Sequence, residues 1–386
     1  MLKYKLSVVV PTKNRYNYLE PLVKLIDSFS RDDIEIVIED NSDDNKDFLP
    51  VLNNNSFPAL HYFYNPQPIS VGENLDNGIL HSQGDYVCVI GDDDGVLSSI
   101  IPCVEWMERN SIDAVIPMTV SYAWPDHDDD TFKRGGIVRI TTDDNKKLVE
   151  YLDPDVVLDE AIKNGFLDRG KLPICYHGIV SRKVLDKVYK IGSQFSPGPS
   201  PDIAAGVALS LVIDNYALVN YPIIISGASI QHGGGAYRMK HGAAEISDLP
   251  FLPKNTLQQW ENSLPKVWSV ETIWPESAIK ALRYMHRQDL IGRINFNKIY
   301  FNFLIRRFYY RKRLYEVVDN KISFFIYLLP NFIILAVEFL LRKITPSKIE
   351  KRSFIEQDNA PTIIEAAKII SSLYPGSKLF HDGNYK

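Results

Sequence analysis

The chain has 386 residues, 45% of them hydrophobic and 24% charged, which is typical of a globular protein with a large core and excludes a disordered chain. A net charge of −5 argues against a general nucleic-acid binder, whose surface is usually basic. The three cysteines, Cys88, Cys103 and Cys175, are widely spaced, so we expect a reducing compartment and neither a disulfide framework nor a zinc site.

Short apolar runs alternate with helical patterns along the first 120 residues. Strands are predicted at residues 6–10, 34–39, 60–64, 86–90 and 114–116, and helices at 16–29, 71–82 and 97–109. Short, regular connections between such elements are typical of βαβ units, so we predict an α/β fold with a mostly parallel central sheet. The apolar stretch at the N-terminus is too short for a signal peptide and is interpreted as the first strand.

The pattern becomes less regular after residue 117. The acidic run 126–130 contains a DxD spacing, but it follows a proline in a polar loop, so we expect it to be exposed to solvent. Further on, helices are predicted at 154–165, after Arg182 and at 202–213, and strands at 216–220 and 223–226. The three glycines at 233–235 predict a mobile loop.

Beyond residue 246 the chain is predicted to be a helical extension with a basic end. Residues 291–355 hold 13 Lys and Arg against 4 Asp and Glu, so an acidic body carries a basic C-terminal region. Within this region, an amphipathic stretch at 299–315 precedes an uncharged run at 322–337 that Pro330 interrupts. As a helix that run would be about 24 Å long, shorter than the roughly 30 Å hydrocarbon core of a bilayer.

Three interpretations of the basic region are open. Its arginines and tyrosines would suit a nucleic-acid site, and its apolar run would suit a helix pair packed on the body. As a membrane-surface element, the region would bury an apolar face while its arginines attract anionic lipid headgroups. The third interpretation best explains why a basic amphipathic stretch lies next to an apolar one. We therefore predict peripheral contact with the inner face of the cell membrane and no nucleic-acid partner.

The strongest local motif is the sequence GDDDG at residues 91–95, in which three carboxylates directly follow an apolar strand. Open α/β sheets bind their ligands at the carboxyl ends of the strands. Mg²⁺ and Mn²⁺ prefer oxygen ligands, and Mg²⁺ is often held by one or two carboxylates together with substrate phosphates. The motif therefore predicts a metal and diphosphate site, and the alternative interpretation is a solvated acidic turn.

Motifs at the neighbouring strand ends favour the metal and diphosphate site. VVVPTKNR at 8–15 ends the first strand, VIEDNSDD at 37–44 ends the second, and GDY at 84–86 leads into the three aspartates. Together these motifs resemble those of the family 2 glycosyltransferases, which have the GT-A fold and an acidic DXD signature. The resemblance is specific over residues 6–116 and weaker up to residue 235.

The resemblance implies a GT-A type nucleotide-sugar-binding fold and assigns roles to residues at the strand ends. Pro11 and Thr12 would line the nucleotide pocket, Asp40 would hydrogen-bond the base, and Asp92 and Asp94 would lie nearest the ribose and the metal. The donor-binding set that it implies is Pro11, Thr12, Arg15, Asp40, Asn41, Asn74, Asp92 and Asp93. For Asp40 and Asn41 the alternative role is to form a capped turn.

Two histidines are further candidates. The resemblance implies a divalent metal, Mn²⁺ or Mg²⁺, on Asp94 and Asp92, and His232 could reach this metal from the loop that precedes the glycines at 233–235. The alternative for His232 is a loop histidine without a ligand. His177 could face the acceptor, but we interpret it as a histidine of the core.

The resemblance also implies a general base. In the family this base is an acidic residue well after the DXD signature, often at the start of a helix, and Asp202 fits that position. An inverting transfer needs such a group to take the proton of the acceptor hydroxyl as its oxygen attacks the anomeric carbon. Alternatively, Ser200 caps the helix and Asp202 only interacts with the positive end of its dipole.

The predicted domains are a GT-A catalytic domain at 1–245, a helical extension at 246–320, an apolar membrane-associated segment at 321–345 and a C-terminal tail at 346–386. The predicted function is that of a metal-dependent, inverting glycosyltransferase. It would transfer a sugar from a nucleoside-diphosphate sugar, first of all a UDP-sugar, to a glycan or a lipid-linked glycan, as in surface-polysaccharide biosynthesis. The alternatives are a sugar-phosphate nucleotidyltransferase, whose glycine-rich phosphate loop is missing at residues 12–17, and a membrane-tethered glycan-binding protein with an inactive donor pocket.

Overall fold

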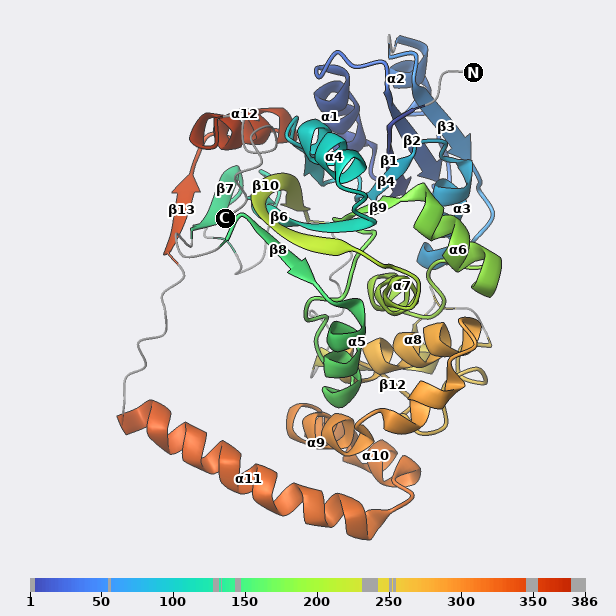
Figure 1. Ribbon diagram of the computed structural model, residues 1–386, viewed down its shortest axis with the longest axis vertical. Coiled ribbons are helices and arrows are strands. Elements are labelled where there is room, and N and C mark those ends of the chain that lie inside the picture. The colour runs from blue at the N-terminus through green and yellow to red at the C-terminus, as the bar shows by residue number, and fades with distance from the viewer. Residues whose placement is uncertain are drawn as a thin grey trace.

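The computed structural model describes residues 4–54, 57–127, 132, 134–142, 147–230, 242–249, 252, 255–344 and 353–375. In Figure 1 a twisted sheet with helices packed around it forms the upper part of the molecule, and a group of helices lies below it. The strands of the main sheet are β1 (Leu6–Thr12), β2 (Ile34–Asp40), β3 (Leu60–Tyr64), β4 (Tyr86–Val89), β5 (Gly95–Val96), β6 (Ala114–Ala123), β7 (Ile137–Thr142), β8 (Val149–Leu152), β9 (Ile179–Ser181), β10 (Tyr216–Ala228) and β13 (Ser353–Gln357). A small second sheet pairs β11 (Ala244–Glu245) with β12 (Val267–Trp268).

The α-helices alternate with the strands in the first part of the chain and dominate the second part. They are α1 (Tyr16–Asp27), α2 (Leu49–Asn54), α3 (Val71–His81), α4 (Ile100–Arg109), α5 (Pro154–Lys163), α6 (Arg182–Gly192), α7 (Pro201–Ser210), α8 (Val270–Tyr284), α9 (Phe296–Arg306), α10 (Arg311–Val317), α11 (Lys321–Ile344) and α12 (Ile363–Leu373). Short 3₁₀ helices lie at Ile246–Asp248, Gln288–Arg293 and Phe308–Tyr310.

The sheet is mixed, but most of its strands run in one direction. Its order is β13-β7-β6-β9-β4-β1-β2-β3, and β10 pairs with β6. β1, β2, β3 and β4 are parallel to one another, and β10 is parallel to β6. β9 is antiparallel to both β4 and β6, so these two share a direction. The structure therefore confirms the predicted α/β class with a mostly parallel sheet.

Two layers of helices bury the strands from both sides. Along β1 and β2 almost every residue is buried, which is typical of parallel strands covered on both faces. One set of β1 side chains, with Val8 and Val10, packs with residues of α1 and α4. The opposite set, with Val9, packs with residues of α3, α6 and α7. Alternation along each strand thus supplies both cores, and the strand ends remain at the edge of the sheet.

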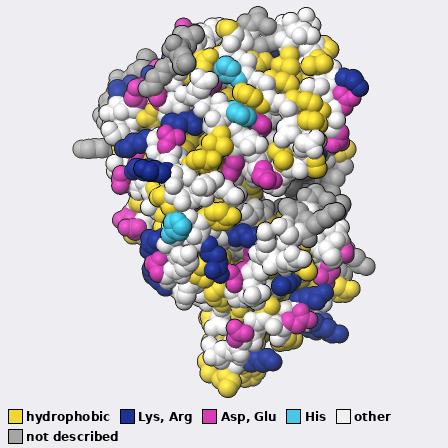
Figure 2. Space-filling view, turned by 90° about the vertical axis from the view of Figure 1, so that its right-hand side faces the viewer, with side chains coloured by type: hydrophobic (Ala, Val, Ile, Leu, Met, Phe, Trp, Pro, Cys, Tyr) yellow, Lys and Arg dark blue, Asp and Glu magenta, His cyan; other side chains and the backbone are white. Residues whose placement is uncertain are grey.

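A long helix with an exposed apolar surface, α11, follows the helical extension. Figure 1 shows α11 along the lower edge of the molecule, away from the sheet. The sequence predicts that Pro330 interrupts the helix. This prediction is wrong, because Pro330 lies inside α11 and the helix continues through it. Figure 2 shows hydrophobic side chains gathered at this lower end. Within the described part of the chain, no helix is both long and apolar enough to cross a membrane.

The chain returns to the main body after α11. β13 adds an antiparallel strand to β7, and α12 packs on α1 through buried residues that include Ile363 and Ile370. The Tyr122 hydroxyl donates a 2.8 Å hydrogen bond to the carbonyl oxygen of Ala360. Residues 353–373, which the sequence assigns to a C-terminal tail, thus complete the sheet and the core of the body.

Candidate active site

Three strand ends place polar side chains together at one edge of the sheet. β1 ends at Thr12, β2 ends at Asp40, and β4 leads into Asp92, Asp93 and Asp94, which we call the acidic triplet. β1 pairs in parallel with both β2 and β4, so the three carboxyl ends meet at the same edge. This edge is where open α/β sheets bind their ligands.

Arg15 holds two members of the acidic triplet. Its Nη1 lies 2.9 Å from Oδ1 of Asp92, and its Nη2 lies 2.5 Å from Oδ2 of Asp93. Thr12 Oγ1 donates to Oδ2 of Asp92 at 2.6 Å, and Ser229 Oγ donates to Oδ2 of Asp93 at 2.7 Å. Both carboxylates are buried, so the guanidinium compensates charges that would otherwise be costly in the protein interior.

Asp94 has a separate set of partners. Its Oδ2 lies 2.6 Å from Nε2 of His177 and accepts hydrogen bonds from the Tyr176 hydroxyl at 2.9 Å and the Gly91 N–H at 2.7 Å. Its Oδ1 accepts from the Gly227 N–H at 2.8 Å. The carboxylate of Asp94 is therefore fixed from both sides, by side chains of one segment and by backbone groups of two others.

Two backbone features allow this arrangement. His177 has a φ of 62°, in the left-handed region, which turns the chain after Tyr176. Gly227 comes so close to the acidic triplet that a Cβ atom there would lie 1.7 Å from the carbonyl oxygen of Asp93. A side chain at position 227 would therefore push the triplet out of place.

The members of the acidic triplet have divergent pKa values. Burial raises the pKa of Asp92 to about 7, with Asp93 adding to the shift and Arg15 opposing it. Burial and the charge of Asp94 also raise the pKa of Asp93. Burial acts on Asp94 too, but the charge and the hydrogen bond of His177 lower the pKa of that carboxyl below its usual range. Although burial opposes it, Asp94 in turn raises the pKa of His177, so the two side chains form an ion pair.

A divalent cation on the acidic triplet does not fit this arrangement. Within the described residues, no three His, Cys, Asp or Glu side chains are grouped so that they could hold a metal. Asp92 and Asp93 face Arg15, whereas Asp94 faces His177. Two cationic side chains already balance the carboxylates to which the sequence assigns the metal.

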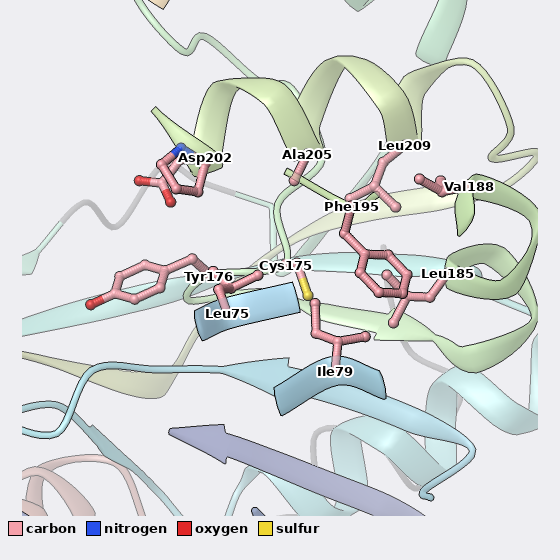
Figure 3. A pocket seen from close by; sticks show the side chains of 11 residues that line it. Leu75, Ile79, Cys175, Tyr176, Leu185, Val188, Phe195, Asp202, Ala205 and Leu209 are labelled. Carbon is pink, nitrogen blue, oxygen red and sulfur yellow. The ribbon is translucent and has the colours of Figure 1, made fainter. Parts of the chain in front are cut away.

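Asp202 opens α7 close to Asp94. Pro201 occupies the first turn of α7, and Ser200 at the N-cap makes no side-chain capping hydrogen bond, so the capping role expected for Ser200 is absent. Asp202 and Tyr176 line one end of a narrow apolar pocket of about 10 Å³, and Figure 3 shows that their polar atoms point the same way, away from Phe195.

Asp202 is exposed to solvent, but its surroundings still change its acidity. Desolvation raises the pKa of this carboxyl first of all, and the charge of Asp94 raises it further. His177 and Arg169 oppose the shift. A raised pKa increases the affinity of this carboxylate for a proton, which is the property that a general base needs.

The second strand end is held mainly by hydrogen bonds within the protein. Asp40 is fully buried; its Oδ2 accepts from the hydroxyls of Tyr16 at 2.7 Å and Tyr62 at 2.6 Å, and its Oδ1 accepts from the Ser42 N–H at 2.8 Å. Asn41 donates through Nδ2 to two backbone carbonyl oxygens in the loop after β3. These contacts form the capped turn that the sequence allows as an alternative.

Asn74 and Pro11 lie where the strands β1 and β2 meet. Asn74 Nδ2 donates to the carbonyl oxygen of Glu39 at 3.1 Å and, at 3.5 Å, to that of Thr12. Its buried Oδ1 has no hydrogen-bond partner among the described residues. Pro11 is half-buried at the same strand end. The predicted donor-binding residues therefore line one edge of the sheet, and their binding roles stay predictions.

Sequence reasoning missed several residues of this site. Ser229, Tyr176 and Trp124, whose Nε1 donates to the carbonyl oxygen of Asp93 at 2.8 Å, come from segments far along the chain, and no motif signals them. His177, interpreted as a core histidine, is instead part of the site through Asp94. The predicted metal ligand His232 lies outside the described residues.

Comparisons with known proteins give one family. Residues 7–162 match the family model described as "Glycosyl transferase family 2". A curated protein of Campylobacter jejuni subsp. jejuni serotype O:2, "GalNAc(5)-diNAcBac-PP-undecaprenol beta-1,3-glucosyltransferase", is 37% identical over 101 residues, which are 25% of this chain and 32% of that protein. The chain thus matches about a third of the length of this relative.

Similar solved structures have TM-scores below 0.5 and share little sequence with the chain. The S. aureus TarS 1–349 structure in complex with UDP-GlcNAc has a TM-score of 0.48 at 12% identity, with 81% of this chain and 89% of that chain covered. The mannosyltransferase PcManGT from Pyrobaculum calidifontis, in complex with GDP-Man and Mn²⁺, has a TM-score of 0.42 at 13% identity, with 96% and 86% covered.

Proposed function

We propose that this protein transfers a sugar from a nucleoside-diphosphate sugar to a glycan or a lipid-linked glycan, and the match of residues 7–162 to the glycosyltransferase family 2 model supports this proposal. The observation that carries the proposal is the position of Asp202 beside the ion pair of Asp94 and His177. A carboxylate with a raised pKa thereby lies near Asp94, at a strand end where a nucleotide ligand is expected. The name of the Campylobacter relative, which includes an undecaprenol-linked glycan, also supports the lipid-linked acceptor.

The proposed chemistry is an inverting displacement. Asp202 accepts the proton of the acceptor hydroxyl while the hydroxyl oxygen attacks the anomeric carbon of the donor sugar. The bond from that carbon to the diphosphate oxygen breaks, and the nucleoside diphosphate leaves. Attack from the side opposite the leaving group inverts the anomeric configuration. A raised pKa suits Asp202 to this role because it increases the affinity of the carboxylate for the proton.

No step of this proposal passes through a metal ion, because the described carboxylates already face Arg15 and His177. The sequence prediction of Mn²⁺ or Mg²⁺ can be tested separately by chelation. If nucleotide release continues in EDTA, Arg15 and His177 suffice to balance the acidic triplet. If release stops and Mn²⁺ restores it, the predicted cation is required and the side chains of the triplet must rearrange around it.

We further propose that the protein binds the membrane surface through α11. Ile322, Phe325, Ile326, Leu329 and Ile333 follow one another at helical spacing and are each more than half exposed. The opposite side of α11 packs on α9, where the rings of Phe324 and Tyr300 lie 5.8 Å apart. One apolar side of α11 thus packs against α9, and a second apolar side is exposed to the surroundings.

The charges around this outward side match an anionic lipid surface. Lys312 and Arg313 of α10 and Lys321 at the start of α11 are exposed, and so is Arg306 at the end of α9. Basic side chains beside an apolar helical stripe are typical of helices that lie in the membrane interface. We therefore place the protein peripherally on the inner face of the membrane. Flotation with phosphatidylglycerol vesicles should carry the full chain to the top of the gradient, and a chain that stays at the bottom contradicts this part of the proposal.

One observation favours a second candidate, a membrane-tethered glycan-binding protein with an inactive donor pocket. Every member of the acidic triplet already has a cationic partner within the chain. A donor panel of UDP-, GDP-, dTDP- and CMP-sugars separates the two candidates. The glycosyltransferase releases nucleotide from one donor, and this release increases when an acceptor is added. A protein with an inactive pocket releases none.

A further inference from the structure

A polar groove of about 680 Å³ lies beside the candidate active site and has no part in the chemistry proposed above. Its walls are α3, the end of α6 with the loop that follows it, and α8 with the segment before it. Its lining includes Asp76, Tyr189, Gln194, Gln259 and Tyr284. Figure 2 views this side of the molecule, where acidic, basic and hydrophobic side chains are interspersed.

The lining of the groove has the chemistry of a carbohydrate site. Tyr189 and Tyr284 line the groove and are 38% and 41% exposed, so part of each ring is accessible. The ring of Tyr189 stacks on Phe195 with the centroids 5.2 Å apart, so one face is supported and the other remains available. Aromatic faces pack against the C–H faces of sugar rings, and the amides of Gln194 and Gln259 offer both donors and acceptors to sugar hydroxyls.

The charges of the groove select a neutral ligand. Glu261 is paired with Arg283 at 2.6 Å, and Glu276 is paired with Lys280 at 3.0 Å, so both cations of the lining are already compensated. Asp76 and Glu73 add negative charge. A diphosphate or an acidic polysaccharide would therefore meet repulsion in this groove, whereas a neutral oligosaccharide would not.

Hydrogen bonds fix the loop that connects the groove to the helix carrying Asp202. The carboxylate of Asp76 accepts hydrogen bonds from the Phe195 N–H, at 3.0 Å, and from the Ser196 hydroxyl. At the other side of the same loop, the Ser200 N–H donates to Ser277 Oγ at 2.7 Å. The loop that forms one wall of the groove therefore ends at Ser200, two residues before Asp202, so a sugar chain bound in the groove would lead toward the start of α7.

We propose that this groove binds the neutral glycan part of the acceptor, with Tyr189 and Tyr284 as stacking platforms. The proposal rests on the proposed glycosyltransferase function for its acceptor, but binding itself does not require turnover. The lipid part of a lipid-linked acceptor would remain at the membrane surface that α11 contacts, while the sugar chain extends through the groove.

Saturation-transfer difference NMR on the full chain tests the binding. The probes are neutral pentasaccharides of N-acetylgalactosamine, N-acetylglucosamine and glucose, with pentagalacturonate as an acidic probe. At least one neutral probe should receive saturation, and Tyr284→Ala should reduce this signal while Tyr151→Ala, an exposed tyrosine on β8, leaves it unchanged. Saturation of the acidic probe alone, of no probe, or equal signals in Tyr284→Ala and wild type would overturn the proposal.

Kinetics separate this proposal from the proposed function. With an active donor, Tyr189→Phe should behave as wild type, whereas Tyr189→Ala and Tyr284→Ala should each raise the acceptor KM about two- to tenfold. Their donor KM and their nucleotide release without acceptor should stay unchanged. An unchanged acceptor KM overturns the groove assignment even when the enzyme is active. If the wild type releases no nucleotide from any donor, the proposed function fails while the NMR result still decides the groove.

Discussion

Nε2 of His177 lies 2.6 Å from Oδ2 of Asp94, and this contact joins two segments that are 83 residues apart in the sequence. His177 reaches Asp94 with a backbone φ of 62°, a conformation that costs a non-glycine residue about 1–3 kcal/mol. Such strain persists only where the surroundings fix the residue. The geometry therefore assigns His177 the task of balancing and orienting Asp94.

Replacing His177 by Ala should destabilise the fold, because it leaves the buried carboxylate of Asp94 without its cation. Breaking a buried ion pair on one side costs about 3–5 kcal/mol. His286→Ala is the matched control, since His286 is exposed and also has a left-handed φ, of 57°. Urea denaturation should show the large loss for His177→Ala alone, and equal losses in both variants would mean that only backbone strain is involved.

Arg15→Met should also be strongly destabilising. Its side chain is 16% exposed and its guanidinium contacts two buried carboxylates, so its removal leaves Asp92 and Asp93 close together without compensation. We expect a loss of about 3–5 kcal/mol. Arg31→Met, which removes a more exposed pair with Asp33, should cost at most about 1 kcal/mol. Similar losses of folding stability in the two variants would contradict the claim that Arg15 compensates two buried carboxylates.

Asp202→Asn should raise the thermal stability at pH 7.5. The pKa of Asp202 is raised in the folded protein, so the fold prefers the protonated form and the ionised form weakens it. The neutral amide removes this cost at neutral pH. The difference in thermal stability between variant and wild type should disappear as the pH falls below about 3.9, the ordinary pKa of aspartate. Asp214→Asn, at an exposed aspartate, should not change Tm. A variant less stable than wild type at pH 7.5 would contradict the raised pKa.

The double substitution Phe325→Glu and Leu329→Glu should release the protein from anionic vesicles. Burying a Phe or Leu side chain contributes about 1.5–3 kcal/mol, so we expect the bound fraction to fall at least about tenfold. Val156→Glu with Leu373→Glu adds the same charges at exposed apolar positions of α5 and α12. If both double variants float equally well, α11 is not the membrane contact.

The sequence predicts the N-terminal half of the fold well, because its signals are local. Runs at 6–10, 34–39, 60–64 and 86–90 are confirmed as β1 to β4, since parallel strands buried on both faces are continuous apolar segments. In contrast, β13 and α12 join the sheet from the far end of the chain. Their pairing partner β7 is more than 200 residues earlier, and no local pattern records such a distance.

Sequence motifs also place the acidic triplet and Arg15 at neighbouring strand ends, but they do not predict the contact between them. Arg15 and Asp92 are 77 positions apart, and only the fold brings their side chains within 2.9 Å. The metal expected on the triplet follows from the carboxylates and from the family resemblance. This prediction does not take into account Arg15 and His177, whose cationic side chains contact the three carboxylates in the folded chain.

Nucleotide release by wild type and Asp202→Asn, measured with the active donor and an acceptor, tests the central claim most directly. General base catalysis contributes about 10²–10⁴-fold, so the variant should lose activity by this factor while its donor affinity, measured by calorimetry, stays the same. Asp214→Asn should keep wild-type activity. Acceptor-dependent release by Asp202→Asn within a factor of about two of wild type would contradict the assignment of Asp202 as the base and, with it, the site proposed for sugar transfer.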